Sequence, residues 1–267
     1  MSYGLSFRDI SVVRTPEAAR TAWGTRTLCA SRPEYHLERL VIRPGACVPA
    51  RYYPVTRSVY FVEDGEVVAL VRGAGGAPSY RRVDAGGVVG VDAGWIHGFR
   101  ASAAGATVYQ FAARPLDDGF VAETTDEAEA RWRLGAASDA APTTERTSDV
   151  RDKYWGKIET ITSEDFAGKR IRINQGGQAS MEFHVRKTES YFVHTGKVRV
   201  GLRTGRAENR SIVLSAGQAF DVTPGVMHMR MALEDTLIIE VSTRDDDGDS
   251  HLVEDGTKYK HVDIEEP

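Results

Sequence analysis

Residues 176–196 of this 267-residue chain read GGQASMEFHVRKTESYFVHTG. Glu182 and His184 are two positions apart in this stretch, so on a β-strand their side chains point to the same face. Glu189 follows after a short reversal, and His228 comes after a later turn. Imidazole nitrogens and carboxylate oxygens are ligands for zinc, manganese and iron. The spacing therefore predicts one divalent metal ion (zinc, manganese or iron) held by Glu182, His184, Glu189 and His228.

The chain contains an internal duplication with an offset of 131 residues, which matches Tyr60-Phe61-Val62 with Tyr191-Phe192-Val193. The same offset, without any gap, matches Gly65 with Gly196, Ala85 with Ala216, Val91 with Val222, Gly94 with Gly225, and His97 with His228. A register that survives over about fifty residues is the signature of a repeated structural unit. We therefore expect two copies of one domain.

Each copy consists of short runs of β-forming residues separated by turn signals, the pattern of an all-β barrel or sandwich. Helix is predicted only at 16–23, where Pro follows a capping Thr, and at 127–134, which a capping box precedes. Residues 135–148 are small, polar and aperiodic, and are interpreted as a linker. The expected domains are then 1–134 and 149–267.

Two blocks of the C-terminal half resemble the two-motif signature of the cupin superfamily, G-x5-H-x-H-x3,4-E-x6-G followed by P-G-x2-H. The matching residues are Gly176, Glu182, His184, Glu189 and Gly196 in the first block, and Pro224, Gly225 and His228 in the second. Glu182 stands where the first histidine is usual. The resemblance implies that each copy is a cupin (jelly-roll) barrel and that the whole chain is a bicupin produced by duplication. It also implies metal binding by the second copy.

Within cupins, residues 155–255 resemble the cupin domain of phosphomannose isomerases. The shared residues are Trp155, Gly156, Ser180, Met181, His184, Lys187, Glu189, Tyr191, Pro224, His228 and the run Ile238 to Val241. In that family a glutamine oxygen usually binds the metal at the position of Glu182, so the glutamate keeps the geometry and adds a negative charge. The acidic segment 244–256 departs from the family, because it lacks the arginine expected after its paired carboxylates.

Strand parity places Tyr191 and Arg230 on the inward face with the metal ligands, and Lys187 lies in the reversal beside them. With Glu182 they are the candidate catalytic residues: Glu182 or Lys187 as the proton-moving base, and Arg230 with Lys187 holding an anion. An inward Tyr or Arg is equally typical of a satisfied barrel core. The acidic run 245–249 lacks the downstream glutamate of a calcium loop and is expected to be a solvated turn.

The resemblance favours a metal-dependent isomerase or epimerase acting on a small sugar or sugar-phosphate-like carbonyl compound. Two alternatives from other classes stay open, because one fold hosts many functions. The first is a non-haem iron dioxygenase, and the second is a non-catalytic cupin that binds a small ligand.

Shifting the ligand positions back by 131 residues gives a copy without a metal site. The equivalents of Glu182, His184, Glu189 and His228 are Arg51, Tyr53, Ser58 and His97. One histidine beside an arginine cannot hold a divalent ion. Aromatic residues at the predicted inward positions indicate instead a barrel filled by side chains, namely Tyr53, Tyr60, Phe99 and Tyr109. An anion-binding pocket at Arg51 stays open as the alternative.

Composition bears on partners and location. The net charge of −4 and the pI near 6.0 give no basic footprint for nucleic acid. No apolar run is long enough to cross a bilayer, and the N-terminus has no secretory pattern. Cys29 and Cys47 have no metal or redox spacing. We expect a cytoplasmic protein with a small, anionic substrate and no membrane or nucleic-acid partner, and leave a homodimer open.

Overall fold

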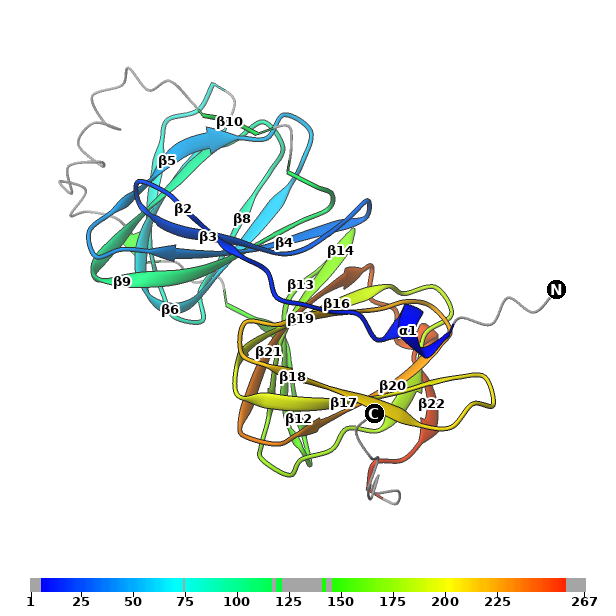
Figure 1. Ribbon diagram of the computed structural model, residues 1–267. Helices are drawn as coiled ribbons and strands as arrows, with labels where there is room; N and C mark the ends of the chain where they lie inside the picture. The colour runs from blue at the N-terminus through cyan, green and yellow to red at the C-terminus, as the bar shows by residue number, and fades with distance from the viewer. Residues whose placement is uncertain (1–5, 74, 117–118, 122–140, 143–145, 258–267) are drawn as a thin grey trace. The chain divides into compact units, whose positions relative to one another are not determined.

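The computed structural model describes residues 6–73, 75–116, 119–121, 141–142 and 146–257, and it is almost entirely β-structure. The chain forms two compact units, Glu17–Thr147 and Met1–Pro16 together with Ser148–Pro267. In each unit the strands curl around an interior (Figure 1). Among the described residues, no helix has the length and apolar character needed to span a membrane. The expected all-β fold with two barrels is confirmed.

The N-terminal unit is built on a ten-stranded sheet in which β11-β7-β6-β9-β4-β3-β2 are neighbours and β5, β8 and β10 attach beside this path. Its strands are β2 (Ala18–Arg20), β3 (Gly24–Arg32), β4 (Tyr35–Ile42), β5 (Cys47–Tyr52), β6 (Ser58–Arg72), β7 (Ser79–Asp84), β8 (Val88–Val91), β9 (Ile96–Ala112), β10 (Phe120–Val121) and β11 (Ala141–Pro142).

A bend in the long strand β6 closes this unit. The first part of β6 pairs with β8 and the second part with β7, and its pairing with β9 shifts register around Gly65. Gly65 has a φ of +77°, and a Cβ there would lie 2.2 Å from the carbonyl oxygen of Gly105. Only glycine permits that backbone conformation and that close approach, so Gly65 is where the sheet curls.

The C-terminal unit contains a seven-stranded sheet, β1-β19-β16-β21-β14-β13-β12, and a five-stranded sheet, β18-β17-β20-β15-β22. Its elements are α1 (Phe7–Ile10), β1 (Val13–Arg14), β12 (Ser148–Lys153), β13 (Gly156–Ser163), β14 (Phe166–Ile173), β15 (Met181–Phe183), β16 (Glu189–Thr195), β17 (Lys197–Thr204), β18 (Arg210–Ser215), β19 (Ala219–Val222), β20 (Val226–Ala232), β21 (Thr236–Thr243), the 3-10 helix η1 (Asp247–Asp249) and β22 (His251–Glu254).

The apolar core of this unit lies between its two sheets and includes Tyr191, Val193, Phe220 and Ile238, all buried. Tyr191 is opposite Phe220 on one side and Glu240 on the other. Side chains opposite one another in a sheet share a face, so Glu240 points inward with Tyr191. The predicted inward position of Tyr191 is therefore confirmed.

The N-terminal segment does not belong to the first domain as expected. β1 pairs with β19 of the C-terminal unit, and both Phe7 and Ile10 pack on the core of that unit. The physical reason is that β19 would otherwise present an unpaired sheet edge, which β1 covers. The expected boundary at 1–134 is corrected to Glu17–Thr147.

Part of the expected linker 135–148 also pairs with the N-terminal unit, because β11 runs parallel to Arg81–Arg82 of β7. The helix expected at 16–23 is wrong, since β2 occupies this stretch and pairs with β3. All three side chains of β2 are exposed, so a helix there would have no apolar face to bury, whereas the edge of β3 supplies backbone partners. The helix expected at 127–134 lies outside the described residues.

One predicted inward residue of the first copy is also wrong. β9 has four residues between Ala101 and Ala106, whereas the equivalent segment of the C-terminal unit has three residues between Ala232 and Thr236. The offset therefore changes from 131 to 130 after this point. Tyr60 is therefore opposite Gln110, not Tyr109. Because a one-residue shift moves a side chain to the other face, Gln110 takes the inward position equivalent to Glu240.

Candidate metal centre

The four predicted ligands lie on three neighbouring segments of the C-terminal unit. Glu182 on β15 is directly opposite His228 on β20. His184 lies just beyond the end of β15, and Glu189 is the first residue of β16. All four line or adjoin the barrel interior, and three of them are buried, whereas the side chain of Glu182 keeps 29% of its surface exposed.

In each histidine, one ring nitrogen hydrogen-bonds to a backbone carbonyl and the other does not. Nδ1 of His184 lies 3.0 Å from the carbonyl oxygen of Asp249, and Nδ1 of His228 lies 3.0 Å from that of Val226. A carbonyl oxygen only accepts, so Nδ1 carries the proton in both rings. The two Nε2 atoms are buried and have no hydrogen-bond donor among the described residues; Nε2 of His228 faces the Glu189 carboxylate, which is itself an acceptor.

These atoms fit a divalent ion. Ligand atoms of Glu182, His184 and His228 all lie within 4.8 Å of one another, and the two imidazole rings are 5.3 Å apart. Buried polar atoms without a partner are costly, and a metal ion would satisfy both Nε2 lone pairs at once. The combination of two imidazoles with one carboxylate suits zinc, manganese or iron.

Glu189 lies beside both imidazoles but is held by other groups. Its Oε1 is 2.9 Å from Nε2 of His228 and accepts a hydrogen bond from the Tyr191 hydroxyl, and its Oε2 is 3.7 Å from Nε2 of His184. Its Oε2 is also 2.8 Å from Nζ of Lys187. Burial alone would raise the pKa of Glu189, but the charges of Lys187 and His228 lower it well below its usual range. Glu189 is thus an anion next to the metal position, and its role as fourth ligand stays a prediction.

Lys187 is buried among three carboxylates. Nζ lies 2.8 Å from Glu189, 3.0 Å from Glu240 and 3.2 Å from Asp245. Burial alone lowers the pKa of Lys187, but the three carboxylates outweigh burial and raise it well above its ordinary value. A protonated lysine cannot accept a proton, so of the two expected bases only Glu182 can act as one.

Arg230 is buried yet incompletely paired. Its guanidinium stands over the Tyr191 ring at 5.2 Å, and its nitrogens reach Glu182 at 3.4 Å and Glu240 at 3.6 Å. Nε of Arg230 has no hydrogen-bond partner in the described part of the chain. A guanidinium has five N–H donors, so this side chain can still bind a planar anion.

Sequence reasoning missed two residues of this site, Asp245 and Asp249, because the run 245–249 was interpreted as a solvated turn. Asp245 pairs with Lys187 and, at 2.7 Å, with Lys169. Asp249 is 4% exposed, and its carboxylate accepts hydrogen bonds from backbone N–H groups next to His184. Nothing in the run itself distinguishes these two residues from Asp246 and Asp247, whose side chains are 54% and 80% exposed.

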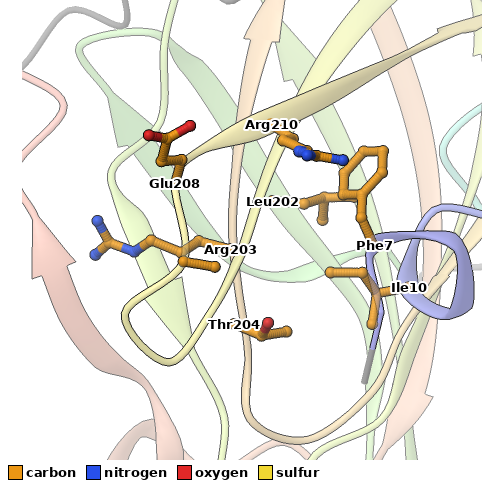
Figure 2. Close-up of a pocket in the computed structure, with 8 residues that line it drawn as sticks. Phe7, Ile10, Leu202, Arg203, Thr204, Glu208 and Arg210 are labelled. Atoms are coloured by element: carbon orange, nitrogen blue, oxygen red, sulfur yellow. The ribbon is translucent and has the colours of Figure 1, made fainter. Parts of the chain in front are cut away.

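A cavity of about 320 Å³ opens onto this centre. Glu182, Lys187 and Arg230 line its inner part, and Tyr154 and Leu252, both largely exposed, line its mouth. A second cavity of about 260 Å³ lies between α1 and the β17–β18 hairpin (Figure 2). It shares no lining residue with the first and contains no histidine, so the candidate chemistry belongs to the first cavity.

The family model described as "Cupin" matches residues 155–261, the part of the chain that carries these ligands. The C-terminal barrel belongs to the cupin family. Mannose-1-phosphate guanylyltransferase 2 of Escherichia coli O157:H7 is 30% identical over 114 residues, which cover 41% of this chain and 22% of that relative. The chain therefore spans about a fifth of that relative's length.

Solved structures of oxalate decarboxylase from Bacillus subtilis match both barrels. One variant has a TM-score of 0.72 at 12% identity, and the match covers 94% of this chain and 81% of the other chain. A second structure, determined in work on the Mn(II) centres of that enzyme, has a TM-score of 0.71 at 12% identity, with 94% and 81% covered. Identity this low establishes the shared bicupin fold alone.

The interior of the N-terminal barrel holds aromatic side chains packed around His97, the equivalent of His228. The Tyr60 hydroxyl donates to Nε2 of His97 at 2.6 Å, and Nδ1 of His97 lies 3.1 Å from the Trp95 carbonyl oxygen. The rings of Tyr60 and Phe99 are 4.5 Å apart, and those of Tyr53 and His97 are 5.7 Å apart. Both nitrogens of His97 are thus occupied, and three of the four aromatic residues predicted to converge do so.

The interior beside Arg51 offers no water-sized space (0 Å³), so the anion pocket considered there has no room for a ligand. Burial lowers the pKa of His97 to about 4, partly opposed by its hydrogen bond to Trp95. The imidazole is therefore neutral at pH 7, as a packed interior requires.

Proposed function

We propose that the C-terminal cupin barrel is a metal-dependent isomerase or epimerase of a small hydroxylated carbonyl compound, sugar-like or sugar-phosphate-like. The observation that carries this proposal is the position of Glu182. It belongs to the three-residue ligand group, yet it is the one predicted ligand that keeps substantial exposure to the cavity. A carboxylate placed between the metal position and the substrate space can serve as a base.

A divalent ion bound here would polarise a carbonyl oxygen and the neighbouring hydroxyl. Glu182 would take a proton from the carbon next to the carbonyl and return it to the carbonyl carbon, while the hydroxyl proton passes from one oxygen to the other. In an epimerisation, solvent in the cavity would instead supply the proton to the opposite face of the first carbon. Arg230, with its unpaired Nε, would hold an anionic group of the substrate. Lys187, which already faces three carboxylates, would hold Glu189 and Glu240 in place through its ion pairs with them.

The anionic character of the substrate is part of this proposal. Five cations and five anions line the cavity: Arg151, Lys153, Lys169, Lys187 and Arg230, and Glu182, Glu189, Glu240, Asp245 and Asp247. A divalent ion would turn this near balance into a net positive charge and favour an anion. The likeness to a mannose-1-phosphate guanylyltransferase agrees with a sugar derivative, although it covers a small part of that enzyme.

A second candidate is an oxidative enzyme of the non-haem iron class. The three grouped ligands are two histidines and one carboxylate, which is the ligand set of many non-haem Fe(II) oxygenases. In that case substrate and oxygen would take the open positions, and no proton would be exchanged with solvent at a substrate carbon.

The test is a deuterium-exchange experiment with an oxygen electrode in parallel. Protein loaded with zinc, manganese or Fe(II) is incubated in D₂O with a panel of aldoses, ketoses and their phosphate esters, with His184→Ala as the metal-site control. We expect carbon-bound deuterium in one substrate without oxygen uptake, and neither with His184→Ala. Iron-dependent oxygen uptake would establish the second candidate instead. Binding of a panel compound with neither deuterium nor oxygen uptake would establish a non-catalytic cupin.

A further inference from the structure

The loop between two predicted ligands, His184 and Glu189, is fastened to one distant side chain. The backbone N–H of Val185 donates to Oδ1 of Asp249 at 3.0 Å, and the N–H groups of Arg186 and Lys187 donate to Oδ2 at 3.0 and 2.9 Å. Asp249 is 4% exposed, so water does not compete freely for these bonds. Three consecutive donors on one charged acceptor define the loop conformation.

The same residue also orients the histidine itself. The backbone carbonyl oxygen of Asp249 accepts the hydrogen bond from Nδ1 of His184 at 3.0 Å. This contact fixes the tautomer and the direction of the imidazole, so that Nε2 faces the metal position. Asp249 is held in turn by η1, where its own N–H donates to the carbonyl oxygen of Asp246 at 2.9 Å.

We propose that Asp249 is a positioning residue of the metal centre: its carboxylate sets the loop that carries His184 to Glu189, and its carbonyl aims His184. The inference rests on the metal site of the proposed function, but not on the reaction. The other two grouped ligands, Glu182 and His228, do not need the Asp249 carboxylate for their position, because strand pairing holds them opposite each other.

Removing the carboxylate of Asp249 therefore frees the loop that carries His184 but leaves Glu182 and His228 in place. The three N–H donors lose their common acceptor, and the loop that carries His184 no longer has a single conformation. Loss of a residue that orients a metal ligand typically weakens metal affinity by about 10–100-fold. We expect this range for Asp249→Ala and a smaller loss for Asp249→Asn, which keeps one acceptor oxygen.

The matched control is Asp247→Asn. Asp247 belongs to the same acidic turn, but its side chain is 80% exposed and its contact is an ion pair with Arg151 at 3.3 Å. The probe is Mn²⁺ or Zn²⁺ alone, titrated into metal-free protein in competition with a chromophoric chelator. The visible spectrum of Co²⁺-loaded protein is recorded as a second readout, because it reports the coordination of the ion rather than the stability of the fold.

We expect wild type and Asp247→Asn to have equal affinities and equal Co²⁺ spectra. Asp249→Ala should bind about 10–100-fold more weakly, with a spectrum shifted toward that of His184→Ala. If Asp249→Ala does not fold, Asp249→Asn takes its place in the same comparison. Wild-type affinity and an unchanged spectrum in the folded variant would overturn the proposal, as would a wild-type protein that binds none of these ions. A wild-type protein that binds metal but isomerises no compound would refute the reaction alone.

Discussion

Replacing Lys187 with methionine tests the charge network around the metal centre. Methionine is unbranched and similar in length, so Lys187→Met removes the charge while leaving little space unfilled. The change deprives Glu189, Glu240 and Asp245 of the ammonium group that lies within 3.2 Å of each. These carboxylates would then repel one another in a largely buried site.

The expected cost follows from this burial. Removing one partner of a buried ion pair typically destabilises a protein by about 3–5 kcal/mol. Lys187 faces three carboxylates, and its side chain is 7% exposed, which favours the upper part of that range. For a unit of this size, such a loss lowers the unfolding temperature by roughly 10–20 °C. A bound divalent ion beside Glu189 would replace part of the missing positive charge, so metal should stabilise the variant more than the wild type.

Denaturant unfolding followed by fluorescence and circular dichroism, with and without excess chelator, measures both effects. Trp155 is buried in the C-terminal unit and reports on it. Lys153→Met, at an exposed position on β12, is the control and should leave the free energy of unfolding unchanged. If Lys187→Met stays within about 1 kcal/mol of the wild type, or if metal stabilises both proteins equally, the charge network described here is wrong.

Three further predictions concern single residues. Glu182→Gln should retain metal, because an amide oxygen also binds it, but should lose deuterium exchange; unchanged exchange would make Glu182 a ligand only. The pKa of His97 is about 4 in the folded protein against an ordinary value of 6.5, so below pH 6.5 the folded state binds fewer protons than the unfolded state. The free energy of unfolding of the N-terminal unit should therefore fall by roughly 3 kcal/mol between pH 6.5 and 4. His97→Gln should not show this loss. Burial lowers the pKa of His228, but Glu189 outweighs burial and raises this pKa above 6.5. Because the metal must displace the proton, metal affinity should rise about tenfold per pH unit up to the raised pKa and then level off. An affinity that does not depend on pH would contradict this.

Much of the site could be predicted from the sequence because strand parity is local. Glu182 and His184 share a face by their spacing alone, and the duplication relates His228 to a recognisable equivalent, His97. The prediction of inward and outward side chains fails where a segment differs in length between the two copies of the repeat. The single extra residue after Ala101 moved Tyr109 to the other face and brought Gln110 inward, and no pattern within that strand signals the change.

Long-range contacts were the other limit. β1 joins the C-terminal unit by pairing with β19, more than two hundred residues away in the sequence, and two-residue strands have no readable periodicity. Asp245 and Asp249 lie in a run that is solvated in most proteins, and their burial depends on η1 folding back onto the loop after His184. Burial of a charge is set by such tertiary contacts rather than by composition.

The central claim is that this bicupin holds one divalent ion, in its C-terminal barrel. Elemental analysis of protein loaded with excess Mn²⁺ or Zn²⁺ and then desalted tests this most directly, with a His184→Ala/His228→Ala double variant and His97→Gln measured beside the wild type. We expect one ion per chain in the wild type and in His97→Gln, and none in the double variant. Two ions per chain, or an ion retained by the double variant, would contradict the claim.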